Sequence, residues 1–140
     1  MKRNLIGILP LLVISLAFSV TANAQTFAKA NVPFAFRVGS ATLPAGTYEV
    51  NPAGDASVVV RNRSAKGAAM STVRHETPRD TGGKLIFHLV GGEYFLAEIW
   101  RSAGSYGLVI PTSKREINLQ KELLASGQSN TGEEILIATY

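Results

Sequence analysis

Two adjacent glycines, Gly91 and Gly92, separate two largely apolar runs in the second half of the sequence. Glycine readily adopts the positive φ angles that a two-residue hairpin turn requires, so the runs Lys84 to Val90 and Glu93 to Trp100 are predicted to form an antiparallel β-hairpin. The turn also fixes the register of the two strands. The pairs expected on one face are Val90 with Glu93, His88 with Phe95 and Ile86 with Ala97, and those on the other are Leu89 with Tyr94, Phe87 with Leu96 and Leu85 with Glu98. Because both faces are largely apolar, we expect the hairpin to be central, covered on one face by the core and on the other by a helix or a partner.

The rest of the chain from residue 32 onward has the pattern of an antiparallel β domain. Short β-branched and aromatic runs alternate with turns, such as Thr42 to Gly46, where Pro44 fixes one φ angle and Gly46 accepts the next. The expected strands outside the hairpin are Val32 to Val38, Thr47 to Val50, Ser57 to Asn62, Ala69 to Glu76, Ser105 to Ile110 and Ile135 to Tyr140. We therefore predict a mainly β fold, an antiparallel meander that forms a small β-barrel or β-sandwich with one C-terminal α-helix.

The helix is predicted from Lys114 to Ala125, ending near Gly127. Thr112 or Ser113 provides an N-cap hydroxyl, and Ser113 with Glu116 fits a capping box, in which each residue satisfies a backbone donor of the other. The apolar stripe expected to face the sheet consists of Ile117, Leu123 and Leu124, helped by Leu119. Because this stripe is narrow, the helix should lie on the outside of the sheet.

The first 24 residues have the three parts of a secretory signal peptide. Lys2 and Arg3 form a basic start, Leu5 to Val20 is an apolar run, and small residues at Ala22 and Ala24 mark a cleavage site after Ala24. A retained anchor is the alternative, but 16 residues span about 24 Å as a helix, less than the roughly 30 Å of a bilayer core. We expect removal of residues 1–24, a single mainly β domain over residues 25–140, no stable transmembrane helix after processing, and export to the periplasm or the medium.

The charge balance gives no sign of a nucleic-acid partner. The chain has 14 basic and 10 acidic residues, and removal of the N-terminal segment leaves 12 basic residues against the same 10 acidic ones. Phosphate binding requires a dense basic stripe, whereas the basic residues here are scattered.

Few residues are suited to catalysis or metal binding. The chain has no cysteine, so disulfides, cysteine-based metal sites and thiol nucleophiles are excluded. His75 and His88 are the only histidines, and the hairpin register places His88 and Glu98 on opposite faces, which argues against a shared metal site. No serine nucleophile motif and no phosphate- or dinucleotide-binding glycine loop is present. We therefore expect a protein without a catalytic centre, a metal or a cofactor.

Two residues of the hairpin need polar partners. His88 is expected to pack on Phe95 with a hydrogen-bonded ring, and Glu98, in an apolar run, must find a partner or shift its pKa. The partner expected for Glu98 is Arg37, Arg74 or Arg101, and its pairing with a second carboxylate in a glycosidase-like cleft has no support from the pattern. The candidate ligand or partner surface of the chain consists of His88, Tyr94, Phe95, Glu98 and Trp100. The alternative interpretation is that the aromatic residues among them belong to the core.

Five segments resemble the landmarks of a family of short exported proteins seen chiefly in acidobacteria. The segments are Val32 to Gly39 (VPFAFRVG), Leu43 to Val50 (LPAGTYEV), Lys84 to His88 (KLIFH), Tyr94 to Trp100 (YFLAEIW) and Pro111 to Glu116 (PTSKRE). The resemblance covers about residues 27 to 125. It implies export and a shared fold, and it transfers no catalytic residue, because the family has no assigned activity.

The leading hypothesis for the function is an exported, non-enzymatic envelope or secreted β-module that acts by binding or structural association. Its partner would be an unidentified envelope component. One alternative is a barrel that carries a small apolar ligand. Another is an outer-membrane barrel, although strands of six or seven residues are shorter than a bilayer requires.

Overall fold

The computed structural model describes residues 26–64, 67–77, 82–102, 106–129 and 132–140. The predicted signal peptide, residues 1–24, lies outside this part of the chain. The described residues form eleven strands and one helix. Their bounds are β1 Ala28–Val32, β2 Phe36–Val38, β3 Ala41–Leu43, β4 Gly46–Pro52, β5 Ser57–Asn62, β6 Ala68–Thr72, β7 Arg74–Glu76, β8 Lys84–Val90, β9 Glu93–Trp100, β10 Gly107–Val109, α1 Lys114–Ala125 and β11 Glu133–Ala138. Within the described residues, no helix is long and apolar enough to cross a membrane.

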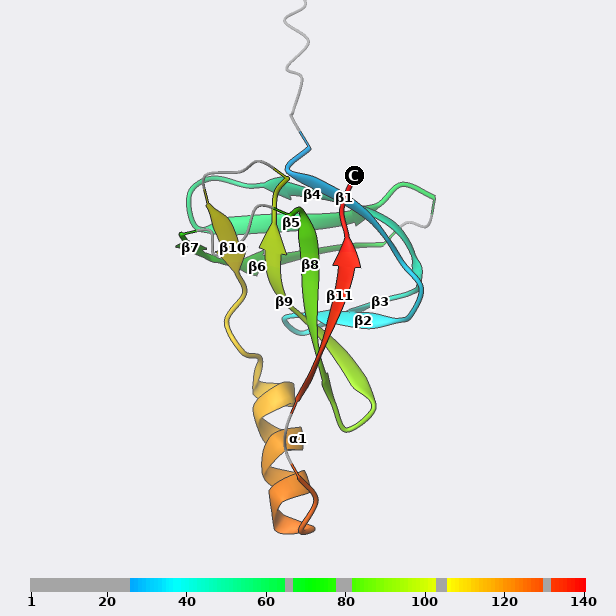
Figure 1. Ribbon diagram of the computed structural model, residues 1–140, viewed down its shortest axis with the longest axis vertical. Helices are drawn as coiled ribbons and strands as arrows, with labels where there is room; N and C mark the ends of the chain where they lie inside the picture. Colours follow the sequence, from blue (N-terminus) through cyan, green and yellow to red (C-terminus); the bar gives the residue numbers. More distant parts are fainter. Residues whose placement is uncertain (1–25, 65–66, 78–81, 103–105, 130–131) are drawn as a thin grey trace, which may run out of the picture.

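The strands form two curled sheets that pack face to face, as predicted for a mainly β domain. One sheet has the order β1-β4-β5-β6, and the other has the order β11-β8-β9-β10-β7, with β2 beside β9 and β3 beside β2. Every pairing is antiparallel except the short contact between β2 and β9. The strands of the two sheets cross at a steep angle (Figure 1), the arrangement of orthogonally packed sheets.

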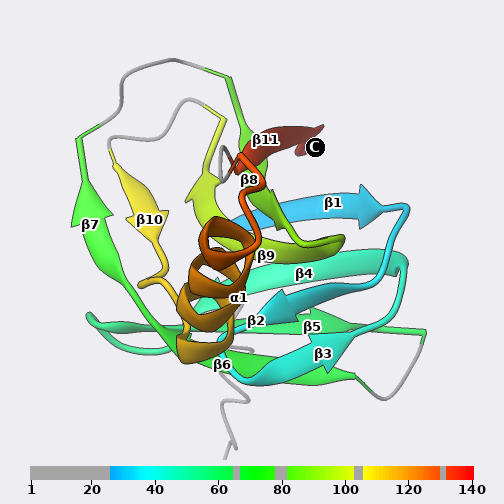
Figure 2. The same ribbon diagram turned by 90° about the horizontal axis from the view of Figure 1, so that it is seen from below.

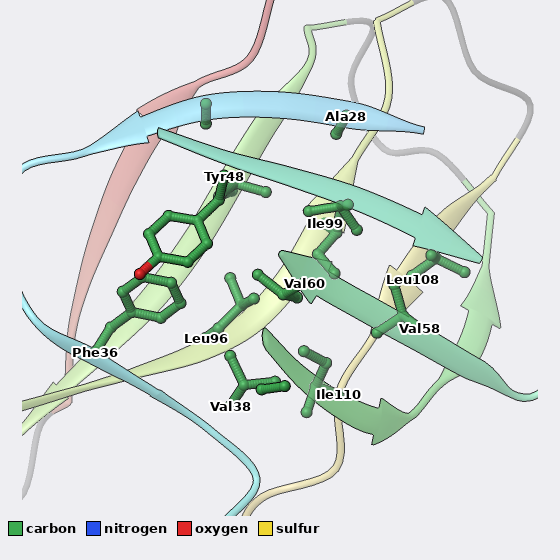
Figure 3. Close-up of a cluster of buried hydrophobic side chains, with 14 of the residues drawn as sticks. Ala28, Phe36, Val38, Tyr48, Val58, Val60, Leu96, Ile99, Leu108 and Ile110 are labelled. Carbon is green, nitrogen blue, oxygen red and sulfur yellow. The ribbon is translucent and has the colours of Figure 1, made fainter. Parts of the chain in front are cut away.

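The main core fills the space between the sheets. Figure 3 shows side chains from both sheets pointing toward one another, among them Phe36 and Tyr48. Phe36, Tyr48 and Phe87 are at most 1% exposed, and the ring of Phe36 meets those of Tyr48 and Phe87 edge-on at 4.9 and 5.3 Å. The hydroxyl of Tyr48 donates to the carbonyl oxygen of Pro44 at 2.5 Å, which satisfies its one strongly polar atom.

Two predicted strands are in fact divided between the sheets. The run Val32 to Val38 was expected to be one strand, but it comprises the end of β1, a break at Pro33 to Ala35, and β2 in the other sheet. The run Ala69 to Glu76 likewise splits at the buried Val73 into β6 and β7. Proline cannot donate to a strand ladder, so Pro33 suits a corner, whereas Val73 carries no such local signal. The turn predicted at residues 42–46 is too long, because its first residues belong to β3, Ala41–Leu43, which pairs with β2.

The hairpin forms at the predicted turn, and its strands are central in their sheet. Gly91 and Gly92 have φ angles of 57° and 79°, and the predicted pairs from Val90 with Glu93 to Phe87 with Leu96 are present. The predicted pairs of Ile86 with Ala97 and Leu85 with Glu98 are wrong. A β-bulge lies at this point, so that Ile86 pairs with Glu98 and Leu85 with Ile99, while Ala97 has no partner on β8. The carbonyl oxygen of Ala97 instead accepts from the backbone N–H of Ile110 at 2.8 Å.

The helix α1 has the predicted bounds and the predicted N-cap, but only the Ser113 half of the capping box forms, because the Glu116 carboxylate binds His88. The Ser113 hydroxyl accepts from the backbone N–H of Glu116 at 3.2 Å. The predicted apolar stripe is correct at Leu119 and Leu123, which pack against the hairpin, and wrong at Ile117 and Leu124, which are 38% and 62% exposed. Figure 1 shows α1 extending away from both sheets, and Figure 2, seen from below, shows it standing at one end of the sandwich.

Candidate functional site

A cluster of ionisable side chains joins α1 to the tip of the hairpin. We call this cluster the junction; it consists of Arg37, His88, Glu93, Arg115 and Glu116. The carboxylate of Glu93 accepts from Arg37 Nε at 2.5 Å and from the Nη2 atom of Arg115 at 2.6 Å. The Nδ1 atom of His88 lies 2.8 Å from Glu116 Oε1. Because an ionised carboxylate only accepts hydrogen bonds, the imidazole donates here.

The local sequence explains why these groups meet. Glu93 is the first residue after the glycine turn, and Arg115 and Glu116 are in the first turn of α1. Beside them, Val90, Phe95 and Leu119 form a small second core, with Leu123 packed against it. A methyl group at Gly91 would lie 3.4 Å from the side chain of Leu119. The tip of the hairpin and α1 therefore pack closely, and the ion pairs fix the orientation of the helix.

The electrostatics of the junction centre on Glu93. The hydrogen bond from Arg115 is the largest influence that holds the pKa of the Glu93 carboxyl below its ordinary value, and Arg37 acts in the same direction; burial opposes them. The hydrogen bond to Glu93 correspondingly raises the pKa of Arg115. The junction thus favours the ionised form of Glu93.

We expect Glu93 to make stability depend on acid pH. A depressed pKa in the folded state means that the contribution to stability is fully present above the ordinary value of 4.5 and is lost as the pH falls through the lower folded-state pKa. Thermal unfolding measured from pH 7 downward should therefore show a steeper loss of melting temperature in the parent protein than in Glu93→Gln. Asp55→Asn, at an exposed position outside the junction, is the control and should keep the parental slope. Equal slopes in the parent protein and Glu93→Gln would contradict this role of Glu93.

The structure places four of the five predicted surface residues on one face of the hairpin. Leu85, Phe87, Leu96 and Ile99 belong to the main core, so the alternate positions, His88, Phe95, Glu98 and Trp100, face away from it. The expectation that His88 and Glu98 lie on opposite faces is therefore wrong, and the bulge at Ala97 is the reason. Tyr94 faces the other way and stacks on Phe34, with ring centroids 3.9 Å apart.

The side chains on this shared face do not form one constellation. His88 has the predicted hydrogen bond, with Glu116 as its partner. Phe95 is buried beneath α1. Glu98 accepts from Trp100 Nε1 at 2.7 Å, and among the described residues it makes no ion pair with Arg37, Arg74 or Arg101. Arg37 binds Glu93 instead.

The polar groups offer little for metal or substrate chemistry. In the part of the chain that the structure describes, no three His, Asp or Glu side chains lie close enough to hold a metal ion. His75 is remote from His88, and its Nε2 atom lies 2.8 Å from the carbonyl oxygen of Asp55. Two open hollows border the junction. One of about 210 Å³ lies at Arg37, Glu93 and Tyr94, and one of about 420 Å³ lies at Ser40, Ser113 and Arg115; both are on the surface.

Ile117 and Leu124, which were predicted to face the sheet, lie on the outer side of α1. Lys114, Ile117, Lys121 and Leu124 are all exposed, and we call them the outward stripe. Their spacing of three, four and three residues places them in one row. Ile117 and Leu124 lie about 140° to 160° around the helix axis from Leu119, given 3.6 residues per turn. The outward stripe therefore points away from the hairpin on which α1 packs.

Comparisons with models of protein families, with curated proteins and with solved structures each gave no match.

Proposed function

We propose that the protein is an exported, non-enzymatic β-module of the cell envelope or the medium, and that it acts by docking a partner on the outward stripe of α1. The observation that carries the proposal is the exposure of Ile117 and Leu124, 38% and 62%, in one row with two lysines. A helix packed on a sheet needs one apolar face, yet α1 has a second one. Recognition through residues spaced three, four and seven apart is a common mode of helix docking.

The junction supports this role because it fixes the position of α1 on the hairpin before a partner binds. Glu93 of the hairpin binds Arg115 of α1, and Glu116 of α1 binds His88 of the hairpin. Leu119 is buried in the same contact. A helix already fixed in place loses little conformational entropy when it binds, which favours affinity. The outward stripe is thus presented on a rigid support rather than on a loose segment.

Export is supported by the N-terminal pattern of charge, apolar run and small residues, and by the resemblance to short exported acidobacterial proteins. Protein recovered from the envelope or the medium of its host should begin at Gln25 when its N-terminus is sequenced. A chain that began at Met1 there would contradict the processing part of the proposal.

The carrier alternative has less support. An apolar ligand would occupy the space between the sheets, and in the described residues that space is taken by large side chains such as Phe36, Tyr48 and Phe87. A closed barrel that holds a ligand leaves its interior partly open instead. Native mass spectrometry of protein from its host would reveal a retained small molecule if this alternative were correct.

Photo-crosslinking in the host tests the docking proposal. A benzophenone amino acid at position 124 should give a discrete crosslinked product, whose identity mass spectrometry would establish. The same amino acid at position 70 is the matched control, because Met70 is 66% exposed on β6 but lies outside the outward stripe. No product at position 124, or equal products at both positions, would overturn the proposal.

A further inference from the structure

We infer that the partner of the outward stripe is a second copy of this chain, and that the stripe docks on the outer side of β11. This inference rests on the proposed function, because it names the partner of the same surface. It also assigns a role to β11, a strand that takes no part in the junction.

The outer side of β11 is apolar at its centre and acidic at its start. Ile135 and Ile137 pack against the main core, so the alternate residues Glu134 and Leu136 face outward. Leu136 is 56% exposed, and Glu133 and Glu134 are exposed as well. β11 is also the last strand of its sheet, so a partner can approach it without displacing a neighbour.

The two surfaces are complementary in charge and in apolar character. The outward stripe places Lys114 and Lys121 beside Ile117 and Leu124, whereas the outer side of β11 places Glu134 beside Leu136. Opposite charges around an apolar contact favour the correct pairing and disfavour contacts between like surfaces. The stripe would therefore not dock on another stripe, and β11 would not dock on another β11.

Both surfaces are on every copy, so two molecules can make the contact twice. In a two-fold dimer, the helix of each copy would lie on β11 of the other, and the assembly would be closed. Within one copy, α1 packs its Leu119 side against the hairpin, which leaves the opposite side open to the second molecule.

Sedimentation of the protein purified from its host tests the inference. At about 100 µM, a concentration at which even a weak dimer with a micromolar Kd is populated, the parent protein should sediment with twice the mass of one chain. Leu124→Glu should give a monomer, and Lys121→Glu and Glu134→Lys should each weaken the dimer about tenfold. The double variant Lys121→Glu/Glu134→Lys should recover to within about threefold of the parent Kd, since it restores opposite charges. Met70→Glu, a charge placed on an exposed residue elsewhere, should leave the dimer unchanged.

The outcomes separate this inference from the proposed function. A monomeric parent protein, or a double variant that dimerises less well than both single variants, would overturn the inference. If position 124 then crosslinked to a different protein, docking through the stripe would stand and only the identity of the partner would change. Circular dichroism of each variant should match that of the parent, so that loss of the dimer cannot be attributed to unfolding.

Discussion

Replacement of Phe87 by alanine is expected to lower the free energy of unfolding by about 3 to 5 kcal/mol, the range for deletion of a buried aromatic side chain. Phe87 is 0% exposed, and its ring meets those of Phe34 and Phe36 edge-on at 5.2 and 5.3 Å. It lies on β8, in the middle of its sheet, where the surrounding strands cannot easily collapse into the cavity. Urea unfolding followed by tryptophan fluorescence measures the loss.

A loss of this size is a large part of the roughly 5 to 15 kcal/mol that stabilises an ordinary domain. Met70→Ala is the control, because the side chain of Met70 is mostly exposed, and its effect should stay within about 0.5 kcal/mol. An effect of Phe87→Ala as small as that of the control would show that the contact between the two sheets does not depend on this ring.

Replacement of Gly107 by alanine is expected to cost about 1 to 3 kcal/mol, the range for overpacking in a tight site. Gly107 pairs with Trp100 across β9 and β10, and an added Cβ would lie 2.4 Å from the indole ring. The ring must move, and its hydrogen bond to Glu98 must weaken. Because Trp100 is the only tryptophan and is 7% exposed, its emission should shift to longer wavelength as the ring becomes more exposed.

Gly82→Ala is the matched control for this change. A Cβ at Gly82 would meet nothing within 4 Å, so the substitution should leave both the emission maximum and the stability within about 0.5 kcal/mol of the parent. An unchanged emission maximum in Gly107→Ala would contradict the close packing of Trp100 over Gly107.

Local signals in the sequence were sufficient for several elements. The glycine pair predicted the hairpin turn, the capping residues and Gly127 predicted the bounds of α1, and β5 coincides with the predicted run Ser57 to Asn62. Each of these depends on residues close together in the chain, where turn geometry and capping act.

The corners and the bulge could not be read in this way. At Val73 the chain passes from one sheet to the other, because β6 before it pairs with β5 and β7 after it pairs with β10. Alternation alone would continue through Ala97, and only the pairing of Leu85 with Ile99 shows that a residue has been inserted. Both are consequences of tertiary contacts, which a periodic pattern does not contain.

The site could be predicted only in part, because it too depends on tertiary contacts. A hydrogen bond for the His88 ring followed from its position on a strand, but its partner Glu116 is 28 residues away on the helix. For α1, the sequence offers two apolar rows, one with Leu119 and Leu123 and one with Ile117 and Leu124. The close approach of Leu119 to Gly91 determines which row faces the hairpin. This contact exists only once the hairpin and the helix are packed together.

The bulge at Ala97 lets β9 bury two side chains that regular alternation would place on opposite faces. Leu96 and Ile99 both reach the core although they are three residues apart, which a regular strand does not permit. Without the bulge, regular alternation beyond Leu96 would turn Glu98 and Trp100 toward the core in place of Ile99. Without Ala97, Leu96 and Ile99 would be two residues apart and would share the core face in a regular strand, so the position of the bulge, rather than the length of β9, decides which side chains are buried.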